Sequence, residues 1–150
     1  MNNFKRAFEQ GIKHADEAAE NIAEINEVLD DFIKSIAELS GNKVKISVKD
    51  KFESESGNPF TTALAAGIGY FGPKGRHYEA LVATNDNVAD SPQFELCEWK
   101  LSEKGYPVRI SYAGQSPSCA DKESLTDNLT ELISSPRAGK FFKQLIELTS

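Results

Sequence analysis

A heptad repeat of apolar and small residues runs through the first forty residues and constrains this chain more than any other feature. Its positions are separated by alternating steps of four and three residues, which is the spacing of one continuous face of an α-helix. No proline interrupts the repeat, and Gly41 and Asn42 follow it, where a left-handed residue can end a helix. The repeat therefore predicts one coiled-coil-like helix over residues 4–39. Its members are Phe4, Phe8, Gly11, Ala15, Ala18, Ile22, Ile25, Leu29, Phe32, Ile36 and Leu39.

This helix is longer than a domain built from the rest of the chain could cover. At 1.5 Å per residue, residues 4–39 span about 54 Å. A compact domain of 150 residues has a diameter of only about 38 Å. Because exposed apolar surface is unfavourable in water, the repeat needs a cover. That cover is a copy of the helix in a homodimer, a different protein, the first turns themselves after a break near Gly11, or the chain's own sheet.

The two halves of the predicted helix differ in the size of their apolar residues. From Ile22 to Leu39 the residues are bulky, as expected of a helix that packs on a sheet. In the first half, small residues would let another helix approach closely, and two phenylalanines would otherwise be exposed. We therefore expect residues 4–18 to mediate self-association in a homodimer. The residues concerned are Phe4, Phe8, Gly11, Ala15 and Ala18.

Five carboxylates follow the same spacing on the opposite face of the predicted helix. Like charges four residues apart destabilise a helix by a few tenths of a kcal/mol, and such a run is usually a solvated surface. As a functional surface it would bind a basic protein partner, because complementary charge raises the association rate and the selectivity. The candidate partner-binding residues are Glu17, Glu20, Glu24, Glu27 and Asp31.

The middle of the chain predicts an antiparallel meander of about five strands. Val44, Ile46 and Val48 alternate with polar residues, which is typical of a half-solvated strand. Short connections separate the strands, so neighbouring strands should run antiparallel. The predicted strands cover residues 43–49, 60–71, 77–84, 94–101 and 108–113, with turns at 72–75 and 105–107 and loops at 53–58 and 85–92.

Two short helices are predicted to follow the sheet. Asp121 or Ser118 can cap the first helix, and Ser135 followed by Pro136 begins the second. No linker divides the chain, so the sequence predicts a single α+β domain with its helices on one face of the sheet. Its parts are the long helix at 1–40, the antiparallel sheet at 43–114 and the C-terminal helices at 118–148.

Composition and motifs argue against several classes of function. The formal net charge is −6 without a dense cluster of Lys and Arg, which argues against nucleic acid binding. No run of about 18 apolar residues and no secretory signal is present, so we expect a cytoplasmic protein without a membrane span. Cys97 and Cys119 lack the spacing of a zinc site. The G-x-G-x-x-G match at 67–72 precedes Pro73 and a strand instead of a helix, so we predict no metal and no cofactor.

Two small-molecule sites remain as alternatives. An enzyme would require a cysteine on one strand beside a histidine on the next. A ligand-binding domain would line a pocket between helices and sheet with aromatic side chains. The candidate catalytic residues are His77, Glu79, Cys97 and Arg109, and the candidate pocket residues are Tyr70, Tyr78, Trp99 and Tyr112.

The sequence therefore predicts that this protein is a non-enzymatic protein-interaction module. The long apolar repeat and the acidic stripe both describe surfaces for other proteins. No nucleophile, metal or cofactor motif accompanies them, so we predict no catalytic residues. One concrete form is an acidic inhibitor or immunity-type protein that masks a basic site on its partner.

Overall fold

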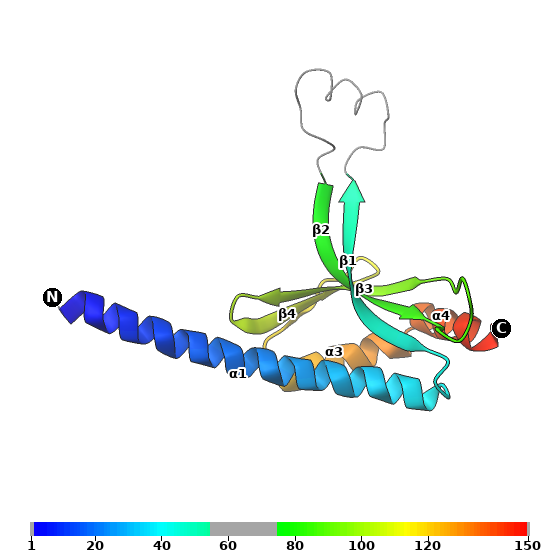
Figure 1. The fold of residues 1–150 in the computed structure, drawn as a ribbon, viewed down its shortest axis with the longest axis horizontal. Helices are drawn as coiled ribbons and strands as arrows, with labels where there is room; N and C mark the ends of the chain where they lie inside the picture. The colour runs from blue at the N-terminus through cyan, green and yellow to red at the C-terminus, as the bar shows by residue number, and fades with distance from the viewer. Residues whose placement is uncertain (1, 55–74, 150) are drawn as a thin grey trace, which may run out of the picture.

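A computed structural model describes residues 2–54 and 75–149, and it confirms the predicted α+β class. A long helix comes first, a five-stranded antiparallel sheet follows, and two short helices come last (Figure 1). The elements are α1 (Asn2–Leu39), β1 (Lys45–Ser54), β2 (Gly75–Thr84), β3 (Phe94–Ser102), β4 (Gly105–Ser111), β5 (Ser118–Cys119), α3 (Lys122–Ser134) and α4 (Pro136–Glu147).

The N-terminal helix α1 is continuous from end to end. It passes through Gly11 without interruption, so the alternative in which the chain breaks there and folds back is wrong. It ends as predicted, because Gly41 and Asn42 both adopt the left-handed conformation with φ of 64°. The Asn42 N–H donates to the carbonyl oxygen of Ala37 at 2.7 Å, which satisfies one of the free carbonyls of the last turn.

The strands follow one another across the sheet in the order β1-β2-β3-β4-β5, and every neighbouring pair is antiparallel. β1 is longer than predicted, since it pairs with β2 from Lys45 opposite Thr84 to Ser54 opposite Gly75. Glu53 therefore belongs to a strand and not to a loop. The predicted strand at 60–71 lies outside the described residues.

The hairpin between β3 and β4 is tighter than predicted. Residues 105–107 were expected to form a turn, but they begin β4. Only Glu103 and Lys104 separate the two strands, since Ser102 already pairs with Gly105. Gly105 has φ of +91°, a conformation that residues with side chains rarely adopt.

The boundary between the sheet and the C-terminal helices also differs from the prediction. Ser118 does not cap a helix, because it lies in β5 and pairs with Arg109 of β4. Asp121 caps α3 instead, and its carboxylate accepts a hydrogen bond from the Ser124 N–H at 2.8 Å. Ser135 caps α4 as predicted, with its hydroxyl accepting from the Ala138 N–H at 3.2 Å.

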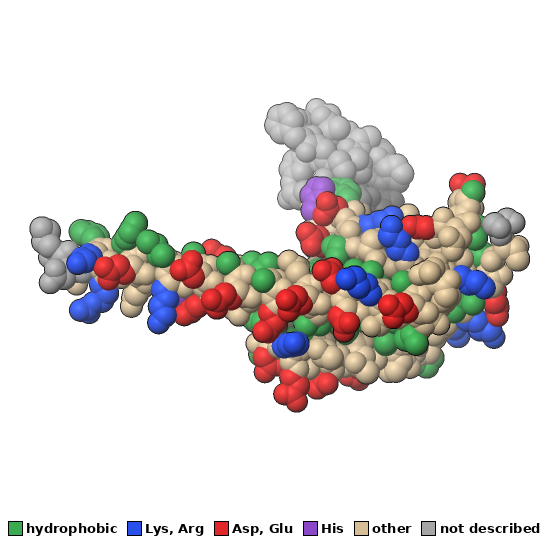
Figure 2. Space-filling model, turned by 60° about the horizontal axis from the view of Figure 1, so that its bottom comes forward, with side chains coloured by type: hydrophobic (Ala, Val, Ile, Leu, Met, Phe, Trp, Pro, Cys, Tyr) green, Lys and Arg blue, Asp and Glu red, His purple; other side chains and the backbone are tan. Residues whose placement is uncertain are grey.

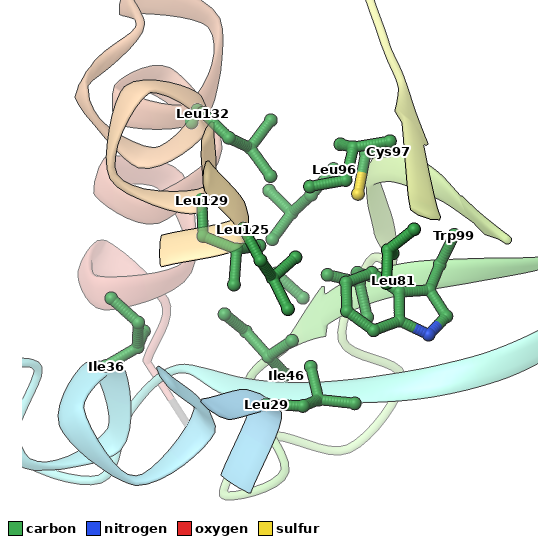
Figure 3. Packing of buried hydrophobic residues seen from close by; sticks show 14 of the residues in the cluster. Leu29, Ile36, Ile46, Leu81, Leu96, Cys97, Trp99, Leu125, Leu129 and Leu132 are labelled. Carbon is green, nitrogen blue, oxygen red and sulfur yellow. The ribbon is translucent and has the colours of Figure 1, made fainter. Parts of the chain in front are cut away.

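All three helices pack on the same face of the sheet, as predicted, and no described helix covers the other face (Figure 1). α1 contacts β1, β4 and α3, while α3 contacts β5 and α4 contacts β2. The core lies between these two layers (Figure 3). Its largest fully buried side chains include Ile25, Ile46, Leu81, Leu96, Ile110, Leu125, Leu132 and Leu145.

Part of the sheet continues as a two-stranded ribbon that rises away from the helices (Figure 1). Glu79 is the last residue of β2 that pairs with β3, opposite Trp99. Beyond it, residues 51–54 pair only with residues 75–78. The half-exposed ring of Phe52 packs against His77, with ring centroids 4.9 Å apart.

Candidate functional site

The N-terminal half of α1 projects beyond the rest of the fold (Figures 1 and 2). Every side chain from residue 3 to residue 17 is exposed, and Ala18 is the first to be half-buried. At 1.5 Å per residue, these fifteen residues form about 22 Å of helix. We call residues 3–17 the overhang and the remainder of the described fold the body.

The β3–β4 hairpin of the body packs against α1 at the turn that follows the overhang. The Asn21 side-chain amide donates to the carbonyl oxygen of Lys104 at 3.1 Å. Gly105 lies so close that a Cβ atom there would be 2.9 Å from the Cβ of Asn21. Ile25, one turn further along α1, is fully buried in the core. The hairpin therefore sets the point at which the helix becomes covered.

The overhang carries an apolar stripe along one edge and charged side chains along the other (Figure 2). Phe4 is 85% exposed and Phe8 is 70% exposed. Apart from the neighbouring backbone of α1 itself, no described atom lies within 4 Å of a Cβ atom at Gly11, so the space beside it is open. The sequence placed Phe4, Phe8, Gly11, Ala15 and Ala18 on one face, and the structure leaves the first four of them uncovered.

Ile12 belongs to the same stripe and was missed by the heptad analysis. It is 51% exposed and lies one helical turn after Phe8. Its position is outside the strict four-three repeat, so the repeat alone did not select it. The i, i+4 relation to an exposed phenylalanine was the signal that could have identified it.

The acidic stripe is not a uniform surface. Glu17, Glu20, Glu27 and Asp31 are exposed, but Glu24 is half-buried. The Tyr106 hydroxyl donates to the Glu24 carboxylate at 2.6 Å. Burial of the phenol ring, followed by this hydrogen bond, raises the pKa of Tyr106. Glu24 therefore helps attach α1 to the β3–β4 hairpin and is not free for a partner.

Two residues of the acidic stripe border a groove between α1 and α3. The groove has a volume of about 540 Å³, and Glu27 and Asp31 stand on its α1 side. Its apolar lining comes from α1 and α3 together, and Lys122 of α3 contributes a positive charge. The apolar residues are Val28, Phe32, Ile36, Leu39, Leu129 and Ile133.

The structure does not bring the candidate cysteine and histidine together. Cys97 lies opposite Leu81, four residues along β2 from His77, and it is buried. Burial is the main cause that raises the pKa of the Cys97 thiol to about 12, so the thiol stays protonated near neutral pH. His77 is exposed on the ribbon. The sequence hypothesis of a Cys97–His77 pair is therefore wrong.

The other two candidate catalytic residues are also apart. Glu79 is exposed and lies opposite Trp99, whereas Arg109 lies opposite Lys100 on the next strand pair. His77 and Glu79 line one surface cavity of about 370 Å³, and Arg109 lines another of about the same volume. The four residues thus do not converge on one point.

The predicted aromatic pocket between helices and sheet is not formed by its described members. Trp99 is buried among the core residues under the helices. The Tyr78 hydroxyl donates to Glu95 at 2.9 Å, and Tyr78 lines one surface cavity with Tyr112 and a different one with Trp99. Tyr70 lies outside the described residues. Tyr112, two residues after the Ile110 that pairs with Trp99, packs against the same core, so the described aromatic side chains are divided between the core and the surface.

The polar groups around Tyr78 satisfy one another. Arg76 pairs with Glu53 at 2.7 Å, also pairs with Glu98, and places its guanidinium 4.8 Å from the centre of the Tyr78 ring. These two ion pairs are the chief cause that raises the pKa of Arg76. The charged and polar groups of this cluster thus bond to one another, and they lie on the sheet face that the helices do not cover.

In the parts of the chain that the structure describes, no three His, Cys, Asp or Glu side chains are grouped so that they could hold a metal ion. None of the described helices is long and apolar enough to cross a membrane. Comparison with protein-family models, with curated proteins and with solved structures finds no match to this chain.

Proposed function

We propose that this protein is a non-enzymatic protein-interaction module that binds through the overhang. The observation that supports this is a run of fifteen consecutive exposed helix residues that includes Phe4, Phe8 and Ile12. In proteins most of the stability of a helix comes from packing its apolar face against another surface, and the overhang has no such surface among the described residues. Contiguous exposed apolar side chains with a polar border are typical of protein–protein contacts.

The partner in this proposal is a second copy of the chain, giving a homodimer. Residues 2–17 carry three basic and three acidic side chains, so the overhang is electrically neutral. Residues 18–39 carry six acids against one base, for a net charge of −5. Two neutral overhangs meet without net repulsion, whereas two copies of the acidic half would repel each other.

Substitution of both exposed phenylalanines is expected to abolish the homodimer. Phe4→Glu with Phe8→Glu places two carboxylates in the apolar stripe, where pairing would bury them without partners. Sedimentation equilibrium at tens of micromolar should show a dimer for the wild type and a monomer for this variant. As the matched control, Gln10→Glu with Lys13→Gln also lowers the net charge by two, but on the opposite face, and it should remain dimeric.

Two results of that experiment would count against the proposal. A monomeric wild type at this concentration would refute self-association. A dimer that survives the double phenylalanine substitution would place the interface elsewhere, and the lysine-bearing edge strand β1 would be the next candidate.

A second candidate function is an acidic inhibitor or immunity-type protein that masks a basic site. It is favoured by the exposure of Glu17, Glu20, Glu27 and Asp31. Among the described residues, none of these four carboxylates forms an ion pair. Such a surface is suited to a basic partner, since opposite charges steer encounter and disfavour wrong partners.

A capture experiment with extract of the native host tests this second candidate. The wild-type chain should retain a basic protein that mass spectrometry identifies. A variant in which Glu17, Glu20, Glu27 and Asp31 are all replaced by their amides should lose it. Added salt should weaken the retention, because exposed charge pairs are screened. A basic protein retained equally by both chains would show that the stripe does not bind it.

A further inference from the structure

We infer that two overhangs pair antiparallel, with the two-fold axis between residues 9 and 10. This inference rests on the proposed homodimer and adds its orientation and register. It follows from where the body lies relative to the apolar stripe, from the sizes of the stripe residues, and from the distribution of charge along the overhang.

The body excludes a parallel arrangement. The exposed stripe continues along α1 into Ile25 and Leu29, which face the chain's own core. A partner helix lying on the stripe and running in the same direction would reach the β3–β4 hairpin at Asn21 and then collide with the sheet. A partner helix that runs in the opposite direction places its own body beyond the N-terminus of the first helix. At that end of α1 the described fold has no other element (Figure 1).

The length of the overhang selects the register. In an antiparallel pair of identical helices, the residue numbers of two facing residues always add up to the same value, and this value defines the register. A sum of 19 places Phe4 opposite Ala15 and Phe8 opposite Gly11, so all four layers lie within the exposed residues 3–17. The next register has a sum of 26 and places Phe4 opposite Ile22, which is already half-buried beside Gly105.

The chosen register also matches large residues with small ones. Each phenylalanine lies opposite an alanine or a glycine, so the two backbones can approach closely and the rings can fill the space between them. Beyond the neighbouring backbone of α1, none of the described residues places an atom within 4 Å of a Cβ atom at Gly11. The Phe8 ring of the second copy therefore has room to pack there.

The charge along the overhang favours the same orientation. Residues 2–9 carry a net charge of +1, from Lys5, Arg6 and Glu9. Residues 10–17 carry a net charge of −1, from Lys13, Asp16 and Glu17. Packed helix axes lie about 8–10 Å apart, which is no more than the Debye length of about 10 Å at 0.1 M salt. Antiparallel pairing sets the net positive half of each overhang against the net negative half of the other, whereas parallel pairing aligns halves of the same sign.

The size of the interface indicates a dimer of moderate affinity. Four phenylalanine side chains, two from each copy, bury about 600–1,000 Å² in total. With Ile12 and the alanines, the interface reaches about the 1,200 Å² that marks the lower limit of stable complexes. We expect a dissociation constant in the micromolar range, so the experiments below use tens of micromolar protein.

Disulfide cross-linking of single-cysteine additions tests the orientation. Phe4→Cys and Ala15→Cys chains are purified separately and oxidised alone and as a mixture. The mixture should give a cross-linked dimer on a non-reducing gel, because the two positions face each other. Each variant alone should stay uncross-linked, since like positions lie about 16 Å apart along the helix, beyond the Cα distance of about 7 Å that a disulfide can span.

The matched control is a mixture of Arg6→Cys and Lys13→Cys chains. These two positions share the same register but lie on the charged edge of the overhang, so they should not cross-link. The native thiols do not compete, because Cys97 and Cys119 are buried. Sedimentation of the reduced variants reports separately whether the dimer still forms.

The outcomes separate the orientation from the homodimer itself. A cross-linked Phe4→Cys dimer without a partner variant would show parallel pairing and would overturn the inference while leaving the homodimer intact. A dimer by sedimentation whose mixture does not cross-link would also overturn the register. A wild-type chain that is monomeric by sedimentation would refute both the homodimer and its orientation.

Discussion

Replacement of Ile25 by alanine is expected to lower the free energy of unfolding by about 2–5 kcal/mol, the usual loss for an isoleucine removed from a core. Ile25 is fully buried where the body first covers α1, and it touches the β3–β4 hairpin at Gly105. Replacement of Ile12 by alanine removes the same atoms, but the Ile12 side chain is already 51% exposed to water. It should change the free energy of unfolding of the monomer by no more than about 0.5 kcal/mol.

Urea denaturation followed by circular dichroism measures both values. The protein is held at a concentration well below the expected micromolar dissociation constant, so that dimerisation contributes little to stability. The two variants share residue type and helix, and they differ only in their position relative to the body. Equal losses at the two positions would show that the overhang packs against the body and is not free.

Replacement of Gly105 by alanine should be the second large effect, with a loss of about 2–4 kcal/mol. A residue with a side chain at φ of +91° is strained by about 1–3 kcal/mol. The added Cβ atom would also lie 2.9 Å from the Cβ of Asn21 and 3.3 Å from the backbone nitrogen of Ile22. The hairpin must therefore move away from α1 to accommodate it, which weakens the attachment of the helix.

Gly114 provides the matched control. It also has a positive φ, of +79°, but apart from its two chain neighbours no atom of the described residues lies within 4 Å of a Cβ atom there. Replacement of Gly114 by alanine should therefore cost only the backbone strain, and thermal or urea unfolding should show a loss smaller than that at Gly105 by at least about 1 kcal/mol. Indistinguishable losses would mean that contact with α1 contributes nothing at Gly105.

Several parts of the fold could be predicted because they depend on local patterns. The four-three repeat predicted α1, and Gly41 with Asn42 predicted its end. The alternation around Ile46 predicted β1, and Ser135 before Pro136 predicted the start of α4. Each of these signals acts within one or two turns or a few residues of a strand, so the rest of the chain is not needed to interpret it.

Other parts depended on which residues meet across the fold. The two-residue β5 exists because Cys119 pairs with Val108. A strand of two residues is too short to show the alternation of apolar and polar residues that would predict it. Cys97 faces Leu81 and not His77 because β2 and β3 pair in the register that places Glu79 opposite Trp99. Register depends on partners distant in sequence, so the candidate catalytic cluster could not be judged from spacing alone.

The sequence by itself determined that α1 carries an apolar face along its whole length and that the bulky half from Ile22 to Leu39 suits packing on the sheet. Only the tertiary structure decided the residue at which the cover begins. The repeat is the same before and after Ala18, because helical periodicity is a property of neighbouring residues. Burial depends instead on the β3–β4 hairpin, which reaches α1 at Asn21 and extends no further. The same hairpin engages Glu24 through Tyr106 and removes it from the acidic stripe. The spacing of the repeat does not change at this boundary, so the end of the body sets where the free surface begins.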